Sequence, residues 1–240
     1  MKNSLVLALC LATLLSAECF AGAFSVSPVR LYFEPRDRAV AVTLVNEGDA
    51  EIALQADIST WMQDAAGVDT LELTEDLIVA PPSLKLAPHS KQVVRLALLV
   101  PRDLSRQMTY RLVVREVPEV MTAKESGIQL PIALVLNMPV FVTPKGARYE
   151  MQCALTPGMA GATGVTCANS GSAYAQVRSI ELSRNGKTLA RFEGGLYILP
   201  GAKKTLQLKP EDGALVTPGA AELTVTGDDR KPQSFGISVP

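Results

Sequence analysis

The chain has 240 residues, of which 48% are hydrophobic, 20% are charged and 5% are aromatic, and its formal net charge is −1. The sequence contains no block of like charges, so neither nucleic acid nor an anionic membrane surface is an expected partner. A domain that binds surface glycans is also not expected, because the sequence has no aromatic cluster to support it.

The first residues have the order of a secretory signal peptide. Lys2 precedes an apolar run at residues 5–15, and small residues then lead to Ala23, where cleavage is expected. The apolar run is too short for a permanent membrane-spanning helix. Lipid attachment at Cys19 is an alternative, but Glu18 stands where a small residue is needed. Removing this segment takes away one lysine and one glutamate, so the charge stays at −1.

Two of the four cysteines lie beyond the signal segment, Cys153 and Cys167. They bracket a turn-rich segment between two strand-like runs, and secretion would place them in an oxidising compartment. A disulfide there would staple a hairpin and contribute roughly 3 kcal/mol. A metal pair is the alternative, but the only histidine, His89, is far away in sequence. A disulfide is therefore predicted.

From Phe24 onward the pattern predicts an all-β chain. Runs rich in Val, Ile, Leu and Thr alternate with Gly, Pro, Asn and Asp at spacings typical of β-sandwiches. The expected strands are 24–33, 39–46, 51–62, 91–100, 108–117 and 128–143, and then 147–155, 163–169, 176–183, 188–193, 203–208, 221–226 and 233–239. Asn185-Gly186 predicts a two-residue hairpin turn. We expect two immunoglobulin-like β-sandwich domains joined end to end, at residues 24–143 and 144–240.

The stretch 127–145 is apolar on both faces if it forms a strand. With a period of two, one face carries Leu130, Ile132, Leu134 and Leu136. A strand that is apolar on both faces normally lies inside a buried sheet. Pro131 and Pro139 lack an N–H, however, and confine the strand to an edge or a bulge. An apolar edge is an aggregation hazard, so the strand is either covered within the fold or kept for a partner.

The common catalytic and metal-binding motifs are missing from the sequence: it has no glycine-rich phosphate loop, no HExxH and no GxSxG. His89 lies in a turn, where a solvated side chain is the ordinary interpretation. The carboxylates of Asp57, Asp64, Asp69 and Glu72 are scattered, and no spacing singles out a pair. Trp61 is interpreted as a core or rim residue of a sandwich. Neither catalysis, a cofactor nor a metal is expected.

A set of short motifs follows in order through the first domain. In chain order these are Ser27-Pro28-Val29-Arg30-Leu31, a turn at Asn46, Trp61, Pro81-Pro82, Leu86-Ala87-Pro88, Gln92–Leu96 and Tyr110–Pro118. Together with the alternating strand they resemble the PapD-like periplasmic chaperones of the chaperone–usher pathway, which assemble pili and fimbriae. The resemblance covers the first domain and continues more weakly through the second, where the cysteine pair fits some branches. It implies a boomerang-like molecule without catalytic activity.

In such chaperones the last strand of the first domain is lent to a pilin subunit, an incomplete sandwich that lacks its final strand. The resemblance implies that this chain binds such subunits in the periplasm and delivers them to an outer-membrane usher, with no nucleic acid or small-molecule substrate. By position, the donated side chains would be Leu130, Ile132, Leu134 and Leu136. The opposite face, with Ala133, would then look into the chain's own sandwich. The alternative is that the leucine face is ordinary core of the first domain.

Family members also hold the C-terminal carboxylate of the subunit between the domains with two basic residues. Arg30 falls at the first of these positions, and alternation turns it away from the face of Val29, Leu31 and Phe33. An arginine suits this role because its planar fork grips a carboxylate with two hydrogen bonds. The alternative for Arg30 is an ordinary surface arginine.

The second basic position departs from the family. The matching site is Pro139, which carries no charge, so Arg95 or Arg111 is left to supply the second cation. Residues 106–111 also lack the Glu and Asn that familiar members have before this strand, which indicates a divergent branch. A second interpretation of the whole chain is a structural subunit of a surface fibre. Such subunits usually donate a strand from an N-terminal extension, whereas the candidate strand here is internal.

Overall fold

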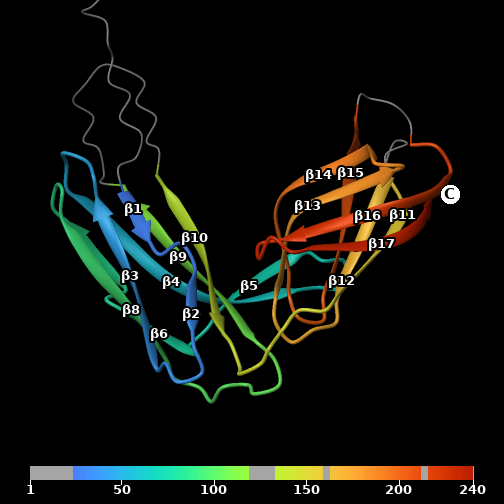
Figure 1. Ribbon diagram of the computed structural model, residues 1–240. Helices are drawn as coiled ribbons and strands as arrows, with labels where there is room; N and C mark the ends of the chain where they lie inside the picture. The colour runs from blue at the N-terminus through green and yellow to red at the C-terminus, as the bar shows by residue number, and fades with distance from the viewer. Residues whose placement is uncertain (1–23, 119–132, 159–162, 212–215, 240) are drawn as a thin grey trace, which may run out of the picture.

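The computed structural model describes residues 24–118, 133–158, 163–211 and 216–239. In these residues the chain consists of β-strands and their connections, without an α-helix. No helix in the described residues is therefore long and apolar enough to cross a membrane. Two sandwiches are joined end to end and meet at an angle, which gives the molecule a bent outline (Figure 1). The predicted fold class is confirmed.

The N-terminal sandwich has two sheets. Its strands are β1 (Phe24–Ser27), β2 (Leu31–Phe33), β3 (Ala39–Asn46), β4 (Ile52–Gln63), β5 (Asp69–Leu73), β6 (Leu77–Ala80), β7 (Ser83–Leu86), β8 (Lys91–Leu98), β9 (Met108–Val117) and β10 (Val135–Val142). One sheet has the order β1-β3-β8-β6 and the other the order β2-β10-β9-β4-β5, with β7 beside β4. Alternate aliphatic side chains of both sheets, such as Leu44, Leu96 and Leu112, are fully buried between them.

Two features of this domain differ from the expected strands. β5, β6 and β7 were not predicted, because they are short and because β5 buries none of its side chains, so its sequence has no amphipathic alternation. The expected strand at 24–33 is divided, since β1 pairs in the first sheet and β2 in the second. Val29 lies in the link between them and is 65% exposed, whereas Leu31 and Phe33 are buried.

The C-terminal sandwich follows one continuous path of strand pairs. Its strands are β11 (Met151–Pro157), β12 (Thr163–Asn169), β13 (Ala175–Arg184), β14 (Lys187–Ile198), β15 (Lys203–Pro210), β16 (Gly219–Gly227) and β17 (Pro232–Val239), and their order is β11-β12-β15-β14-β13-β16-β17. The turn at Asn185-Gly186 has positive φ at both residues, 51° and 76°, as a type I′ hairpin requires. In β14, Gly194-Gly195 form a bulge opposite Arg178 of β13, and the strand continues beyond its predicted end at 193 to Ile198.

The two cysteines close the first hairpin of this domain. Cys153 of β11 and Cys167 of β12 lie directly opposite each other in the strand register. A disulfide joins them, as predicted from the sequence. Both residues contribute to the C-terminal core.

An asparagine turn occurs in the same form in both domains. Asn46 ends β3 and Asn169 ends β12, and each is followed by the pattern x-Gly-x-Ala. Each Oδ1 accepts the N–H of the glycine at 3.0 Å, and each Nδ2 donates to the carbonyl of the alanine. Each Nδ2 also donates at 3.0 Å to a distant carbonyl, that of Leu86 or of Ile198. Both asparagines are buried, so these bonds are shielded from water.

Candidate functional site

β10 has an open edge along its first half. It pairs with β9 from Val135 to Val142 but with β2 only from Val140 to Val142. In the described part of the chain, the edge from residue 134 to residue 139 therefore has no partner strand opposite β9. This edge runs along the inner side of the N-terminal arm (Figure 1).

The register shows which backbone groups face this open edge. The N–H of Glu116 donates to the carbonyl of Leu134, directly opposite, at 2.9 Å. In an antiparallel ladder the even-numbered residues of β10 are then bonded to β9, and the odd-numbered ones face away from it. Within the described chain, the N–H and C=O groups of Val135 and Asn137 therefore face the open side without a backbone partner. Pro139 lacks its N–H on this same side. This agrees with the edge position that the proline predicts.

The side chains of β10 divide by parity. Leu134 and Leu136 are partly buried against the N-terminal core, while Met138 is fully in it. Ala133 and Val135 are exposed, so the expectation that the face of Ala133 looks into its own sandwich was wrong. Strand register decides the parity, and it turns the even-numbered face toward the core. Leu130 and Ile132 lie outside the described residues, and their role stays a prediction.

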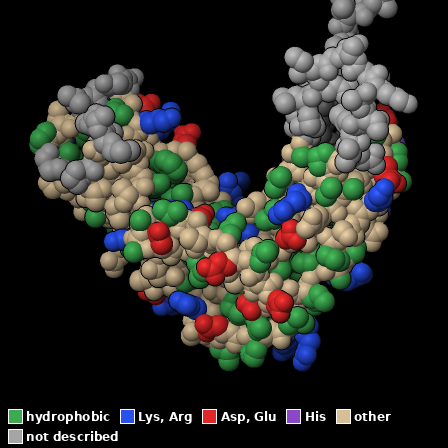
Figure 2. All heavy atoms as spheres, turned by 180° about the vertical axis from the view of Figure 1, so that it is seen from behind, with side chains coloured by type: hydrophobic (Ala, Val, Ile, Leu, Met, Phe, Trp, Pro, Cys, Tyr) green, Lys and Arg blue, Asp and Glu red, His purple; other side chains and the backbone are tan. Residues whose placement is uncertain are grey.

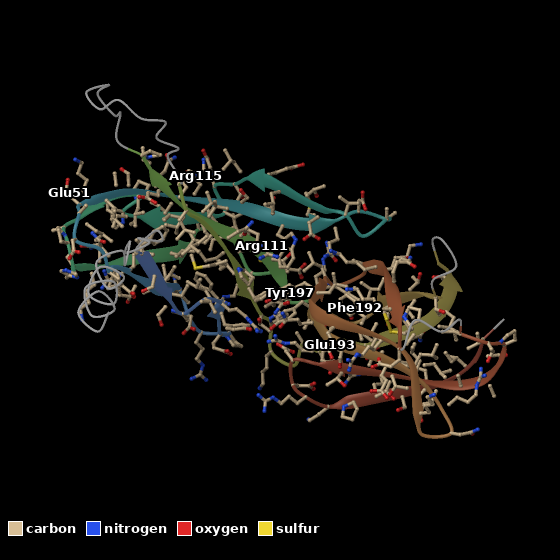
Figure 3. All side chains as sticks on the ribbon, turned by 90° about the horizontal axis from the view of Figure 1, so that it is seen from above. Glu51, Arg111, Arg115, Phe192, Glu193 and Tyr197 are labelled. Atoms are coloured by element: carbon tan, nitrogen blue, oxygen red, sulfur yellow. A yellow bond between two sulfur atoms is a disulfide. The ribbon has the colours of Figure 1, made fainter. Side chains whose placement is uncertain are left out.

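Arg111 lies beside the proline that occupies the expected basic position. It is paired across the ladder with Pro139, so both side chains leave the same face of the sheet. The Cζ of Arg111 is 3.6 Å from the centroid of the Trp61 ring and 5.5 Å from that of Tyr197. Figure 3 shows Arg111 and Tyr197 near each other between the two domains. The neighbouring strand therefore supplies a positive charge next to the uncharged proline.

Arg30 lies in the same cleft but is already paired. Its Nη1 is 2.9 Å from Oδ2 of Asp228, which lies in the turn after β16 of the other domain. The hydroxyl groups of Tyr32 and Tyr174 are 2.8 Å apart, and Tyr174 donates to the same carboxylate oxygen at 3.4 Å. Burial alone would lower the pKa of Arg30, but Tyr32, Tyr197, Tyr174 and Asp228 raise it overall. Its charge is thus balanced within the protein.

Arg111 differs from the other described charges of the cleft in having no ion pair. Arg30 is paired with Asp228, and Asp69 is paired with Lys204 at 2.8 Å. Among the described residues Arg111 makes no ion pair with a carboxylate. Burial lowers the pKa of Arg111, against the opposing effects of Asp69 and Tyr197. A half-buried guanidinium stacked on a ring and lacking an ion pair is a ready site for an anion.

Arg95, the other candidate for the second cation, faces away from the cleft. It lies on β8 in the four-stranded sheet, between Val94 and Leu96, which are both fully buried. Because side chains alternate along a strand, Arg95 projects from the outer face of that sheet. It is exposed there and does not reach the side of the molecule that holds Arg30 and Arg111.

A separate apolar cluster joins the domains at the base of the cleft. It consists of Trp61, Phe141 and Leu199, with Tyr174, Tyr197 and Ala202 packed against them. Phe141 and Tyr174 stack with their ring centroids 4.1 Å apart. Trp61, expected in the core or at the rim of a sandwich, is 1% exposed and lies near the end of β4, in this cluster and not in the main N-terminal core. The space-filling view shows the open notch that lies between the two arms (Figure 2).

Polar contacts from the N-terminal domain reinforce this junction. The Gln107 side chain donates to Thr143 Oγ1 at 2.8 Å and accepts the N–H of Tyr174 at 2.9 Å. The Gln63 side chain donates to the carbonyl of Tyr197 at 3.0 Å. Gly67, in the turn between β4 and β5, has a φ of 81° and lies so close to Lys203 that a Cβ would overlap the lysine carbonyl. These contacts hold the two domains together at the base of the cleft.

Several residues of the cleft were not singled out from the sequence. They are Tyr32, Tyr174, Tyr197 and Asp228. The chain has only five tyrosines and one tryptophan, so the small number of these residues could have marked the tyrosines as candidates. Sequence spacing could not bring them together, because they come from different domains. Among the described residues no group of acidic, histidine or cysteine side chains could hold a metal ion.

Comparison with family models matches residues 23–148 to pili and flagellar-assembly chaperones, PapD N-terminal domain. No curated protein matches the chain. Similar folds occur in solved structures. A chain of the CsuC–CsuE chaperone–tip adhesion subunit pre-assembly complex, from the archaic chaperone-usher Csu pili of Acinetobacter baumannii, is 19% identical with a TM-score of 0.67, over 89% of this chain and 97% of that one.

Two further structures are of chaperones without a named partner. The YadV chaperone is 15% identical with a TM-score of 0.64, over 90% of this chain and 100% of that one. The Pseudomonas aeruginosa CupB2 chaperone is 17% identical with a TM-score of 0.57, over the same shares, 90% and 100%. At such identities these likenesses establish the fold.

Proposed function

The chain belongs to the family of pili and flagellar-assembly chaperones that have the PapD N-terminal domain, and on that premise we propose that it binds incomplete pilin-like subunits along the open edge of β10. It then delivers them to an outer-membrane usher. The family is one of assembly chaperones, which is consistent with a protein that is not an enzyme. Structures similar in fold include a SafA pilin in complex with the SafB chaperone from Salmonella enterica, which supports a subunit as the partner.

The observation that carries this proposal is the free backbone of β10 beside a partly covered apolar face. A strand of the subunit would bond to the outward N–H and C=O groups of Val135 and Asn137, which is β-augmentation. Leu134 and Leu136 are only partly buried in the free protein. A subunit laid along the edge would complete their burial, and full burial of a leucine is worth roughly 1.5–3 kcal/mol relative to exposure. These side chains would then be shared between the two cores.

The proposed anchor for the subunit carboxylate is Arg111, with Arg30 as its neighbour. The rings of Trp61 and Tyr197 lie against the guanidinium of Arg111, and its N–H donors lie in the guanidinium plane. A planar carboxylate can bind there through two parallel hydrogen bonds. Arg30 is the weaker candidate for the initial contact, because Asp228 already balances its charge.

The compartment and the domain limits complete the proposal. A signal peptide cleaved after Ala23 would send the chain to the periplasm, where a disulfide between Cys153 and Cys167 is stable. The first domain would comprise residues 24–143 and the second residues 144–240. The passage between β10 and β11 at residues 143–150 is compatible with these limits.

Two proline substitutions on adjacent residues test the proposed edge. Val135→Pro removes an N–H that faces the open side, whereas Leu136→Pro removes one from the ladder with β9. We expect Val135→Pro to melt near the wild type and to lose a co-expressed, tagged pilin-like subunit in pull-downs. Leu136→Pro should melt well below the wild type. A Val135→Pro protein that retains subunit at the wild-type level would refute binding along this edge.

A further inference from the structure

We infer that Asp228 is an internal substitute for the ligand carboxylate on Arg30, and that an incoming subunit carboxylate exchanges with it. The inference rests on the proposed function, because it concerns the regulation of the same cleft. Its basis is the contact between Arg30 Nη1, in the link from β1 to β2, and Asp228 Oδ2, in the turn from β16 to β17. This ion pair crosses from one domain to the other.

The geometry of the pair leaves room for a stronger competitor. The contact joins one guanidinium nitrogen to one carboxylate oxygen at 2.9 Å. A guanidinium has five N–H donors arranged as a fork, and a carboxylate that approaches it in plane makes two parallel hydrogen bonds. A ligand carboxylate with free access to the fork would therefore bind Arg30 more strongly than Asp228 does through a single contact. Exchange is favourable for that reason.

Release of Asp228 would not leave a buried charge without a partner. The side chains of Arg30 and Asp228 are each 25% exposed, so water reaches both. Tyr174 donates to the same oxygen of Asp228 from 3.4 Å, and the exposed residues Arg230 and Lys231 follow in the same turn. The large penalty for breaking a fully buried ion pair does not apply here. The internal acid can thus move aside at moderate cost.

The exchange would set the affinity of the cleft. Asp228 neutralises Arg30 within the protein, and Arg111 is the described cleft cation without an ion pair. A carboxylate is first attracted by Arg111, and it gains Arg30 only by displacing Asp228. The internal acid therefore weakens capture by a fixed factor, which favours later release of the subunit.

The test removes the charge of Asp228 and measures a defined probe. An N-acetylated tetrapeptide of alanine and valine with a free α-carboxylate is titrated beside its C-terminal amide. The fluorescence of Trp61, the only tryptophan in the chain, is the readout. We expect Asp228→Asn to bind the acid about two- to fivefold more tightly, as loss of a partly exposed competing ion pair implies. Binding of the amide should not change, and Asp228→Asn combined with Arg30→Ala should lose the gain.

Asp229→Asn is the matched control. It makes the same charge change in the same turn, but Asp229 accepts a hydrogen bond from Tyr149 at 3.0 Å and does not contact Arg30. It should not tighten binding. A wild type that prefers the acid, with no gain in Asp228→Asn, would overturn the exchange but leave the carboxylate site standing. A wild type that binds acid and amide equally would overturn both.

A second measurement decides the matter if Asp228→Asn does not fold. In the ¹³C-labelled wild type, the side-chain carboxyl signal of Asp228 should shift when the acid peptide saturates the cleft. The amide peptide should leave that signal in place. A carboxyl signal that is unchanged at saturation with the acid would overturn the exchange.

Discussion

The two sandwiches of this protein use the same internal device but differ in how they finish their edges. Asn46 and Asn169 occupy equivalent turns, and each binds the glycine N–H and the alanine carbonyl that follow it. In the C-terminal domain the edge hairpin is closed by a disulfide between Cys153 and Cys167. In the N-terminal domain, the first half of β10 has no described strand on its outer side.

This difference separates stability from binding. Buried hydrogen bonds at the ends of both sandwiches hold the scaffold, and they do not depend on β10. On its open side, the described part of β10 has backbone N–H and C=O groups without a partner strand. Its leucine side chains are only partly buried by the N-terminal core. Under the proposed function, a subunit would pair with these backbone groups and cover these side chains without unfolding the N-terminal domain. The following predictions test this division, from the largest expected effect to the smallest.

Removal of either asparagine should cost the most stability. Asn46→Ala leaves the N–H of Gly48 and several carbonyls without their partner, and Asn169→Ala does the same in the other domain. Each buried polar group left unsatisfied costs about 1–3 kcal/mol. We therefore expect each variant to lose roughly 3–5 kcal/mol of unfolding free energy, measured by urea denaturation followed by circular dichroism. Equal stability of variant and wild type would contradict a shared structural role.

Removal of Arg111 should weaken binding more than folding. Arg111→Ala is expected to cost about 2–5 kcal/mol of affinity for a pilin-like subunit, because the ligand carboxylate would lose its charged partner in a partly dry cleft. Arg115→Ala, on the same strand, is the control, since Arg115 is exposed and pairs with Asp57 at 3.1 Å. It should change affinity little. If calorimetry gave the same loss for both variants, Arg111 would not be the anchor.

Loss of the disulfide should show the opposite pattern. Cys153→Ser combined with Cys167→Ser should lower the unfolding free energy of the C-terminal domain by roughly 3 kcal/mol. Subunit binding at 25 °C should remain close to that of the wild type, because the staple lies away from β10. Thermal unfolding and subunit pull-down of the same preparation test both statements. A loss of binding in a folded double variant would contradict the separation of the two regions.

The residue pattern was sufficient to predict the fold class and the edge position of β10. Period-two alternation and turn residues identified most strands, and the prolines predicted that β10 lies at an edge. Alternation could not decide which face of β10 looks inward, because both faces are apolar and parity depends on the register with β9. The short strands β5 to β7 were missed because the first of them buries no side chain.

The cleft was less accessible to prediction than the fold. Arg30 was singled out from the sequence, but its pairing with Asp228 joins residues 198 positions apart. The position of Arg111 beside Pro139 follows from strand register, which no local pattern contains. The aromatic cluster at Trp61 likewise assembles from two domains. Contacts across a domain boundary depend on the domain angle, and the sequence does not state that angle.

The smallest predicted effect concerns the contact between Asp69 and Lys204 at the domain junction. Burial raises the pKa of Asp69, but hydrogen bonds from Lys204 and Gln63 lower it overall. Because the pKa is lower in the folded state, ionised Asp69 stabilises the fold at pH values above its unfolded-state pKa of about 4. This stabilisation is lost as the pH falls through the folded-state pKa. Asp69→Asn should therefore lower Tm slightly at pH 7, because Asp69 is 41% exposed and ion pairs near the surface contribute roughly 0.2–1 kcal/mol. The difference in Tm should shrink below about pH 4, and a difference independent of pH would contradict this assignment.

Hydrogen exchange of the β10 amides tests the central claim most directly. In the free protein, the amides of Val135 and Asn137 should exchange quickly, and those of Leu136 and Met138 should be protected by the ladder with β9. Addition of a pilin-like subunit should protect Val135 and Asn137 strongly and change Leu136 and Met138 little. Val135 and Asn137 amides that still exchange quickly in a saturated complex would contradict subunit binding along this edge.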